Sequence, residues 1–413
     1  MTSDFKADVI IAGAGPNGLA MALALGGSAL RRPLDVVLID ATDPRARQGA
    51  PQDTRGLALT LATQGLFRAL KAWDGLSPHL QEMRQIRVTD GTGALSERPV
   101  LLAFATDPQQ RAAAAIAESR HVTGALLDAV LASPQIRLLT GSGLASIDVL
   151  PGHVKAITAA GEAVKAPLII GADGRNSFVR NAAGIAAEAR PYGQTALTFT
   201  AGHELPHDGC AEEHFSPEGV VALLPLPGNR SSLVWGASPS RAAELMALTA
   251  EAFDAELNRQ IGSHLGRIAV EGGRQAYPLQ MQLAETQIAP RLALAGDAAH
   301  VLHPLAGLGL NLGFKDVAAL ADCIHDAVAR GEDHGGPAML ERFAAWRRFD
   351  TSATAMLMDG FNGLFVNDNP VLKQIRDTGL RLADRVPALK TLFMQEASGL
   401  TGDLPRLMRG IAP

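Results

Sequence analysis

Glycines spaced for binding a nucleotide stand near the start of the chain. The run Gly13-Ala14-Gly15-Pro16-Asn17-Gly18 matches G-x-G-x-x-G. It lies between a predicted strand, Asp8–Ala12, and a predicted helix, Pro16–Leu30. Gly13 permits a tight turn, Gly15 lets backbone amides approach a pyrophosphate, and Gly18 allows close helix–strand contact. Asp40 ends the next predicted strand, where a carboxylate can accept ribose hydroxyls. This context favours a dinucleotide site over a plain glycine-rich turn beside a surface aspartate.

One such pattern serves nicotinamide and flavin enzymes alike, and two later segments distinguish them. Gly171-Ala172-Asp173-Gly174 follows the predicted strand Leu168–Ile170, and Gly296-Asp297 follows the predicted strand Leu292–Ala295. A Gly-Asp pair at the end of a strand supplies the short acceptor that a polyol chain requires. The second segment continues through His303-Pro304-Leu305-Ala306-Gly307-Leu308-Gly309-Leu310-Asn311, which opens a predicted helix that runs on to Val328.

These paired segments resemble the signatures of class A flavoprotein monooxygenases, the single-component FAD-dependent aromatic hydroxylases. The resemblance implies FAD as cofactor, with NADPH or NADH as electron donor. It also implies that Asp297 binds the ribityl hydroxyls, that Asp173 supports FAD and NAD(P)H binding, and that Arg55 of Asp53-Thr54-Arg55 lies by the flavin. The expected cofactor-binding residues are Gly13, Gly15, Pro16, Asn17, Gly18, Asp40, Arg55, Asp173, Gly296, Asp297, Pro304, Gly307, Leu308, Gly309, Leu310 and Asn311.

The resemblance narrows to the ubiquinone-biosynthesis hydroxylases. Five further segments carry it, four in the middle of the chain and one near its end: Tyr192–Ala196, Phe215–Gly219, Leu223–Leu226, Tyr277–Leu279 and Gly399–Pro405. Together with the FAD signatures, they extend the resemblance over nearly the whole chain. Two positions depart from the group, because Leu308 stands where the family commonly has Gln and Val220 where the subgroup usually has Pro. The implied substrate is a polyprenyl phenol intermediate of ubiquinone biosynthesis, hydroxylated on its ring with dioxygen.

Two residues are candidates for catalysis. His303 could position a phenol or take its proton, since a histidine titrates near neutral pH, although a structural histidine is the commoner case. Arg55 is the second candidate, because its family-like element places it where it could orient the flavin or the nicotinamide. No metal site is predicted.

The elements that must position these residues form an α/β (α+β) fold. We expect a Rossmann-like FAD-binding domain with a parallel sheet, interrupted by a mostly antiparallel-sheet substrate domain and followed by a helical tail. The predicted division gives residues 1–74, 100–182 and 283–336 to the FAD-binding domain, residues 75–99 and 183–282 to the substrate domain, and residues 337–413 to the C-terminal helical segment. The strand segments Val220–Leu224 and Leu233–Trp235 could line an apolar channel or simply form sheet core.

Composition limits the partners. A net charge of -5 gives no strong cationic field, so binding of nucleic acid is not expected. The two cysteines, Cys210 and Cys323, lie far apart in sequence, which fits a reducing compartment. No apolar run is long enough for a membrane helix, and no export signal is evident. We expect a cytoplasmic protein, with attachment to the inner membrane or to a quinone-biosynthesis complex left open.

Several other functions remain to be weighed. A flavin halogenase would need a W-x-W-x-I-P segment, whereas Trp73, Trp235 and Trp346 stand singly. A disulfide reductase would need a redox cysteine pair and a second dinucleotide pattern. Hydroxylation of another small aromatic or secondary metabolite stays open, as does a non-catalytic flavin-binding subunit of a quinone-synthesis assembly. The favoured interpretation is an oxidoreductase, an FAD-dependent NAD(P)H monooxygenase.

Overall fold

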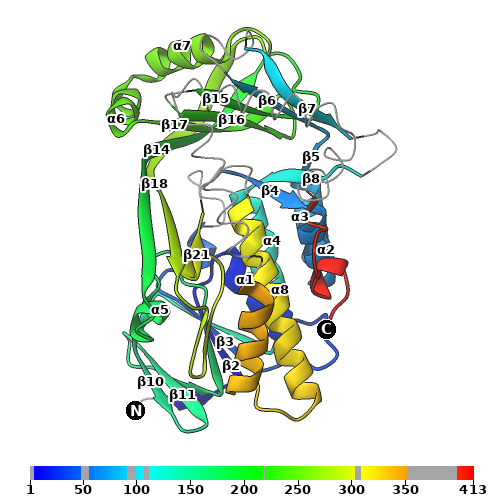
Figure 1. Ribbon diagram of the computed structural model, residues 1–413, viewed down its shortest axis with the longest axis vertical. Coiled ribbons are helices and arrows are strands. Elements are labelled where there is room, and N and C mark those ends of the chain that lie inside the picture. The colour runs from blue at the N-terminus through cyan, green and yellow to red at the C-terminus, as the bar shows by residue number, and fades with distance from the viewer. Residues whose placement is uncertain are drawn as a thin grey trace.

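The protein consists of three stacked parts, and Figure 1 shows them from bottom to top. A lower body is built on a parallel sheet, a small sheet lies above it, and a large sheet under two helices forms the top. This computed structural model describes residues 4–47, 55–90, 98–106, 111–216, 219–302, 308–348, 350 and 398–413.

The lower body has a six-stranded sheet in the order β19-β20-β13-β2-β3-β9. Every neighbouring pair is parallel except β19 with β20. The strands are apolar almost throughout, as expected where both faces of a parallel sheet are covered. Their bounds are β19 Ile288–Ala289, β20 Leu292–Leu294, β13 Leu168–Gly171, β2 Val9–Ala12, β3 Val36–Asp40 and β9 Ile136–Thr140.

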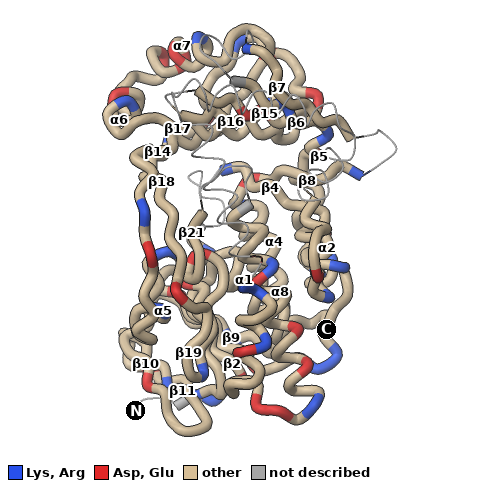
Figure 2. The backbone as a smooth tube through the Cα atoms, viewed as in Figure 1, with Lys and Arg blue, Asp and Glu red and all other residues tan. Residues whose placement is uncertain are grey.

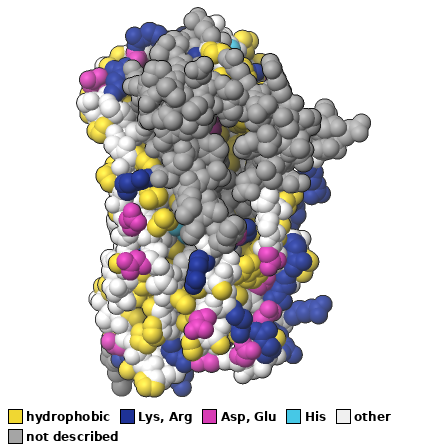
Figure 3. Space-filling model, in the orientation of Figure 1, with side chains coloured by type: hydrophobic (Ala, Val, Ile, Leu, Met, Phe, Trp, Pro, Cys, Tyr) yellow, Lys and Arg dark blue, Asp and Glu magenta, His cyan; other side chains and the backbone are white. Residues whose placement is uncertain are grey.

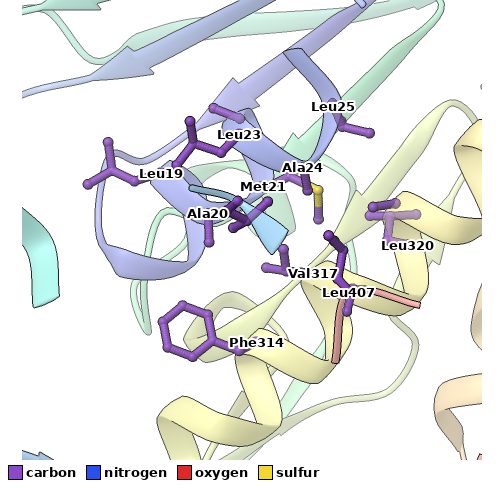
Figure 4. Packing of buried hydrophobic residues seen from close by; sticks show 14 of the residues in the cluster. Leu19, Ala20, Met21, Leu23, Ala24, Leu25, Phe314, Val317, Leu320 and Leu407 are labelled. Atoms are coloured by element: carbon purple, nitrogen blue, oxygen red, sulfur yellow. The ribbon is translucent and has the colours of Figure 1, made fainter. Parts of the chain in front are cut away.

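Helices cover one face of this sheet and a second sheet covers the other. The helices are α1 (Pro16–Gly26), α4 (Ser119–Leu131), α8 (Leu308–Ala329) and one over residues 337–348. Figure 4 shows Met21 of α1, Phe314 of α8 and Leu407 of the C-terminal segment packed in one apolar cluster. The covering sheet has the order β1-β12-β11-β10, with bounds Asp4–Lys6, Ala163–Ala166, His153–Thr158 and Leu144–Leu150.

The top of the molecule is an eight-stranded sheet in the order β21-β18-β14-β17-β16-β15-β6-β7. Helices α6 (Pro239–Ala247) and α7 (Ala250–Ile261) pack on its outer face. Two strands of 17 residues each, β14 and β18, run from this sheet down along the lower body. The bounds are β21 His300–Val301, β18 Ile268–Ala284, β14 Ala187–His203, β17 Arg230–Ala237, β16 Gly219–Leu226, β15 Cys210–Ser216, β6 Gln85–Asp90 and β7 Val100–Ala105.

The small middle sheet has the order β4-β8-β5, with bounds Gly56–Thr60, Ala114–Glu118 and Gln81–Met83. Three short helices complete the fold: α2 (Leu61–Ala69), α3 (Trp73–Leu76) and α5 (Phe178–Ala182). The C-terminal segment buries Leu407 and Met408 against α2 and α8. A Cβ on Gly65 of α2 would lie 2.5 Å from the Met408 carbonyl oxygen, so only glycine allows this close approach.

The predicted fold class is confirmed, with differences in detail. The dinucleotide unit is present as β2-α1-β3, but α1 ends at Gly26 rather than at the predicted Leu30. Strand β7, which the predicted division places in the FAD-binding domain, pairs with β6 in the large sheet, and β6 pairs parallel with β15. The division into domains stays a prediction. The tail begins as the helix over 337–348, and residues 351–397 of the predicted helical tail lie outside the described residues.

Charges of both signs are interspersed. Figure 2 shows acidic and basic residues together on the lower body and on α6 and α7. On the face drawn in Figure 3, both signs lie among apolar and uncharged side chains over the lower body. Among the described helices, none is long and apolar enough to cross a membrane.

Candidate functional site

Four of the predicted segments meet at one edge of the parallel sheet. Gly13 follows β2, Asp40 ends β3, Asp173 follows β13 and Asp297 follows β20. Since these strands are parallel neighbours, their carboxyl ends lie side by side in the order β20, β13, β2 and β3. Ligands of open α/β sheets bind at this edge.

The glycines of the first segment have different structural causes. A Cβ on Gly13, whose φ is +98°, would lie 2.3 Å from the Ala172 carbonyl oxygen, and one on Gly18 would lie 1.8 Å from the Gly13 carbonyl oxygen. Both are therefore required by the fold itself. A Cβ on Gly15 would meet no atom of the described residues within 4 Å. The described packing therefore does not require glycine at this position, and it leaves space for a bound group beside the loop.

The start of α1 is free for an anion. Gly15 is the N-cap residue, no side chain among the described residues caps the helix, and the first turn holds no acidic residue. Its first amides therefore point outward with the positive end of the helix dipole. Asp40 shapes the same loop, because its carboxylate accepts from the Ala14 N–H at 2.7 Å and from the Thr42 N–H at 2.7 Å.

Asn17 joins this loop to the last motif segment. A Cβ on Gly296 would lie 2.1 Å from the Asn17 Nδ2 atom, and one on Gly313 would lie 2.4 Å from it. The amide side chain therefore fills the space between two glycines of the segment that follows β20. Its Oδ1 atom is buried and has no hydrogen-bond partner among the described residues. The glycine pattern predicts Asn17 as a cofactor-binding residue but does not indicate this packing role.

Asp297 combines exposure with close protein surroundings. Its side chain retains solvent-accessible surface. Protein atoms nevertheless surround it closely, and this desolvation raises the pKa of its carboxyl above the ordinary value. His300, Arg55 and Arg175 lie close enough to act against that rise. The predicted arginine is thus brought into electrostatic range of the predicted ribityl acceptor, although 242 residues of sequence separate them.

A buried ionic network supports the turn that carries Asp297. The Asp316 carboxylate of α8 accepts from the Gly296 N–H at 3.0 Å, from His300 Nε2 at 2.6 Å and from Arg347 Nε at 2.7 Å. Burial opposes its ionisation, but His300 and Arg347 outweigh this and hold the pKa of Asp316 at about 2. Asp316, Arg347 and His300 were not predicted as site residues, and only the closeness of His300 to Asp297 in sequence hinted at such a role.

Comparisons with known proteins decide the family. The family model described as "FAD binding domain" matches residues 6–355. The chain is 40% identical to ubiquinone hydroxylase UbiL of Rhodospirillum rubrum over 99% of this chain and 94% of that protein. It is 31% identical to 3-demethoxyubiquinol 3-hydroxylase of Escherichia coli, over 95% of this chain and 98% of that one.

The chain belongs to the FAD-binding-domain family of FAD-dependent monooxygenases. The fold agrees, because the p-nitrophenol 4-monooxygenase PnpA from Pseudomonas putida superposes with a TM-score of 0.79 at 16% identity, covering 97% of this chain and 99% of that one. The resemblance seen in the sequence is confirmed, and FAD is the cofactor of this monooxygenase.

The residues present fit FAD. The space at Gly15 and the uncapped start of α1 suit a pyrophosphate, and the exposed Asp297 suits a polyol. A Cβ on Gly309, in the first turn of α8, would also meet no atom of the described residues within 4 Å, so the described packing leaves room for a flat ring against this backbone. At Gly15 and Gly309, the described packing of the monooxygenase would also accommodate a larger side chain, so the open space there remains for a cofactor.

Other predicted residues have structural partners in the monooxygenase. Asp173 accepts hydrogen bonds from Ser177 Oγ and, at 3.1 Å, from the Val179 N–H, so it holds the start of α5. The buried Arg180 donates to the carbonyl oxygens of Arg175 and Ala298, at 2.9 and 3.0 Å, and thereby ties the two later motif segments together.

Asn311 is also engaged by the protein. Its Oδ1 accepts from Thr63 Oγ1 at 2.7 Å and its Nδ2 donates to the Ala58 carbonyl oxygen at 2.7 Å, which fixes α8 against β4 and α2. Leu310 packs against the main core cluster. His303, Pro304 and Gly307 lie outside the described residues, and Leu308 begins α8.

The large sheet presents apolar side chains to the segment that carries Asp297. Val88, Leu102, Phe215 and Val220 form a buried cluster, and Leu302, next to β21, packs against it. Val221, Leu223, Leu233 and Trp235 instead pack beneath α6 and α7. Side chains alternate along these strands, so half of the predicted apolar lining is ordinary core and Val220 is on the other face.

Proposed function

We propose that this FAD-dependent monooxygenase hydroxylates the aromatic ring of a prenylated intermediate of ubiquinone biosynthesis, with NAD(P)H and dioxygen as co-substrates. The observation that carries the proposal is sequence similarity along nearly the whole chain, at 40% and 31% identity, to a ubiquinone hydroxylase and a demethoxyubiquinol hydroxylase. The apolar cluster beside Leu302 supports it, because an isoprenoid tail needs hydrophobic surroundings close to the reacting ring.

The cofactor-binding roles proposed for this chain rest on space beside two glycines and on acceptor side chains at the ends of strands. The start of α1 and the space at Gly15 would take the pyrophosphate, and Asp40 the ribose. Asp297 would accept from the ribityl hydroxyls, and Asp173 would order the neighbouring turn. The backbone at the start of α8 would face the flavin ring, where the positive end of a helix dipole favours negative charge.

The protein's part in the reaction is to bind, orient and exclude water. FAD, when bound, supplies the redox chemistry, namely hydride acceptance from NAD(P)H and activation of dioxygen. Arg55 would orient the flavin or the nicotinamide, and His303 would position the phenol or take its proton. The apolar side chains of the large sheet would hold the tail and keep water from the ring.

We further propose that the enzyme works at a membrane surface or within a quinone-biosynthesis assembly, because a polyprenyl substrate partitions into lipid. A flotation assay with liposomes, with and without added prenyl phenol, measures this association. Recovery of the protein only in the lipid-free fraction under both conditions would contradict the membrane part of the proposal.

The test of the substrate class compares phenols with and without one isoprene unit. Burial of its five carbons contributes up to about 4 kcal/mol, so the prenylated phenol should bind more tightly by up to about a thousandfold. Affinity is measured by quenching of flavin fluorescence, and hydroxylated product is quantified against peroxide. Efficient hydroxylation of a water-soluble aromatic acid, with prenyl phenols ignored, would refute the quinone-pathway proposal but leave the monooxygenase family intact.

A further inference from the structure

The backbone at Arg55 is fastened from two sides. The Ser119 N–H, at the start of α4, donates to the Arg55 carbonyl oxygen at 2.8 Å. The next residue, Gly56, donates its N–H to the Oγ atom of Ser232 at 2.7 Å. Ser232 belongs to β17, in the middle of the large sheet. The arginine proposed to lie by the flavin is therefore tied directly to the sheet proposed to cover the substrate.

The contact between Gly56 and Ser232 leaves no room for another group. A Cβ on Gly56 would lie 2.7 Å from the Ser232 Cβ and 3.0 Å from its Oγ. Ser232 is 1% exposed. A shift of β17 relative to β4 would therefore displace the Arg55 backbone or break this hydrogen bond.

A second contact joins β17 to β8, the neighbour of β4 in the small sheet. Gly56 of β4 pairs with Glu118 of β8, and the Glu118 carboxylate accepts from Arg230 Nη2 at 3.1 Å. Arg230 stands two residues before Ser232 on β17. The large sheet thus contacts both members of one pair in the small sheet, which fixes their relative position.

The Arg55 side chain acts on the site from this position. Its charge lowers the pKa of Asp297 against the effect of burial. The Arg55 guanidinium and the Asp297 carboxylate are thus opposite charges within Coulomb range of each other, and this links the fastened Arg55 backbone to the proposed ribityl acceptor.

We propose that Ser232 is a positioning residue that sets the place of Arg55 over the flavin site and so couples the substrate sheet to flavin reduction. The proposal rests on the role of Arg55 proposed above. The residue most similar to Ser232 is its neighbour Ser231, which is also buried. Ser231 lies on the opposite face of β17, where its Oγ contacts His203 Nε2 at 3.1 Å. Ser231 therefore provides a matched control.

The experiment measures the rate constant for FAD reduction by NADPH in the holoenzyme, mixed anaerobically in a stopped-flow instrument. Ser232→Ala should lower it about tenfold to a hundredfold, the size of effect that small misplacements produce. Ser231→Ala should leave it within about twofold, since it removes one hydrogen bond of the same kind on the other face. Gly56→Ala, which pushes on the same contact from the opposite strand, should reproduce the loss, and melting temperatures show that each variant is folded.

The outcomes separate the proposal from the function on which it rests. In an Arg55→Ala background, Ser232→Ala should add no further loss, because both changes remove the same positioned group. Equal rates in Ser231→Ala and Ser232→Ala, or additive losses with Arg55→Ala, would overturn the positioning role alone. An unchanged rate in Arg55→Ala by itself would overturn the role of Arg55, and with it the coupling.

Discussion

Replacing Asp316 by Asn tests the buried network beneath the flavin turn. Its carboxylate accepts three hydrogen bonds from donors of Gly296, His300 and Arg347, and both Asp316 and Arg347 are 0% exposed. The amide that replaces it has one oxygen for three donors. It also leaves the guanidinium buried without a counter-charge from this position.

The magnitude follows from two considerations. Removing one partner of a buried ion pair costs about 3–5 kcal/mol. The pKa of Asp316 falls from 3.8 to about 2, which corresponds to a contribution of about 2.5 kcal/mol from ionisation alone. The first figure is the better guide, because the variant loses hydrogen bonds as well as charge. We therefore expect Asp316→Asn to lower the free energy of unfolding by about 3–5 kcal/mol.

The assay is urea unfolding at fixed FAD concentration, with Asp333→Asn as control. Asp333 pairs with Arg291 at 2.6 Å but is half exposed, so its loss should cost no more than about 1 kcal/mol. In the wild type, the contribution of Asp316 to the free energy of unfolding is fully present above pH 3.8 and is lost as the pH falls towards 2. The reason is that the carboxyl is protonated near pH 3.8 in the unfolded chain but only near pH 2 in the folded protein. A loss in Asp316→Asn no larger than that of the control would refute the supporting role of the network.

Three other predictions concern binding and reactivity. Gly15→Val should abolish FAD binding in a folded protein, whereas Gly18→Ala should impair folding, because of these two glycines only Gly18 is enclosed by backbone. FAD content and circular dichroism of the two variants check this, and FAD retained by folded Gly15→Val would contradict it. Asp297→Ala should weaken FAD binding by about one to two decades, as loss of a charge-assisted hydrogen bond does, and fluorescence titration that finds equal affinity would speak against the ribityl role. Burial raises the pKa of the Cys210 and Cys323 thiols to about 11, so both should react with a thiol reagent only after unfolding, and rapid labelling of the native enzyme would be inconsistent with their burial.

The sequence predicts the parts of the candidate site that depend on local pattern. The glycine run, Asp40 and Asp297 are predicted because a strand, a turn and a helix follow each other within about thirty residues. The parallel sheet then brings their ends together without further information. Even so, the pattern did not reveal that Gly13 and Gly18 serve the fold and Gly15 faces open space.

Contacts between distant elements could not be predicted in this way. Asp316 and Arg347 are ordinary charged residues of two helices, and only the packing of those helices makes them a buried pair. Ser232 carries no pattern that connects it with Gly56, 176 residues earlier. The same holds for β7, whose apolar run suits either domain until its pairing with β6 is known.

The two long strands β14 and β18 also give the upper sheet a continuous connection to the lower body. They pair antiparallel from Ala187–Ala284 to His203–Ile268, so one two-stranded ribbon belongs to both parts of the protein. The pairing is interrupted between Pro191 and Thr195, beside Gly193 with its φ of +70°. A second interruption follows between Thr198 and Thr200. Irregularities of this kind bend a strand and increase its twist, so the ribbon can turn from the lower body into the upper sheet without a break in either strand.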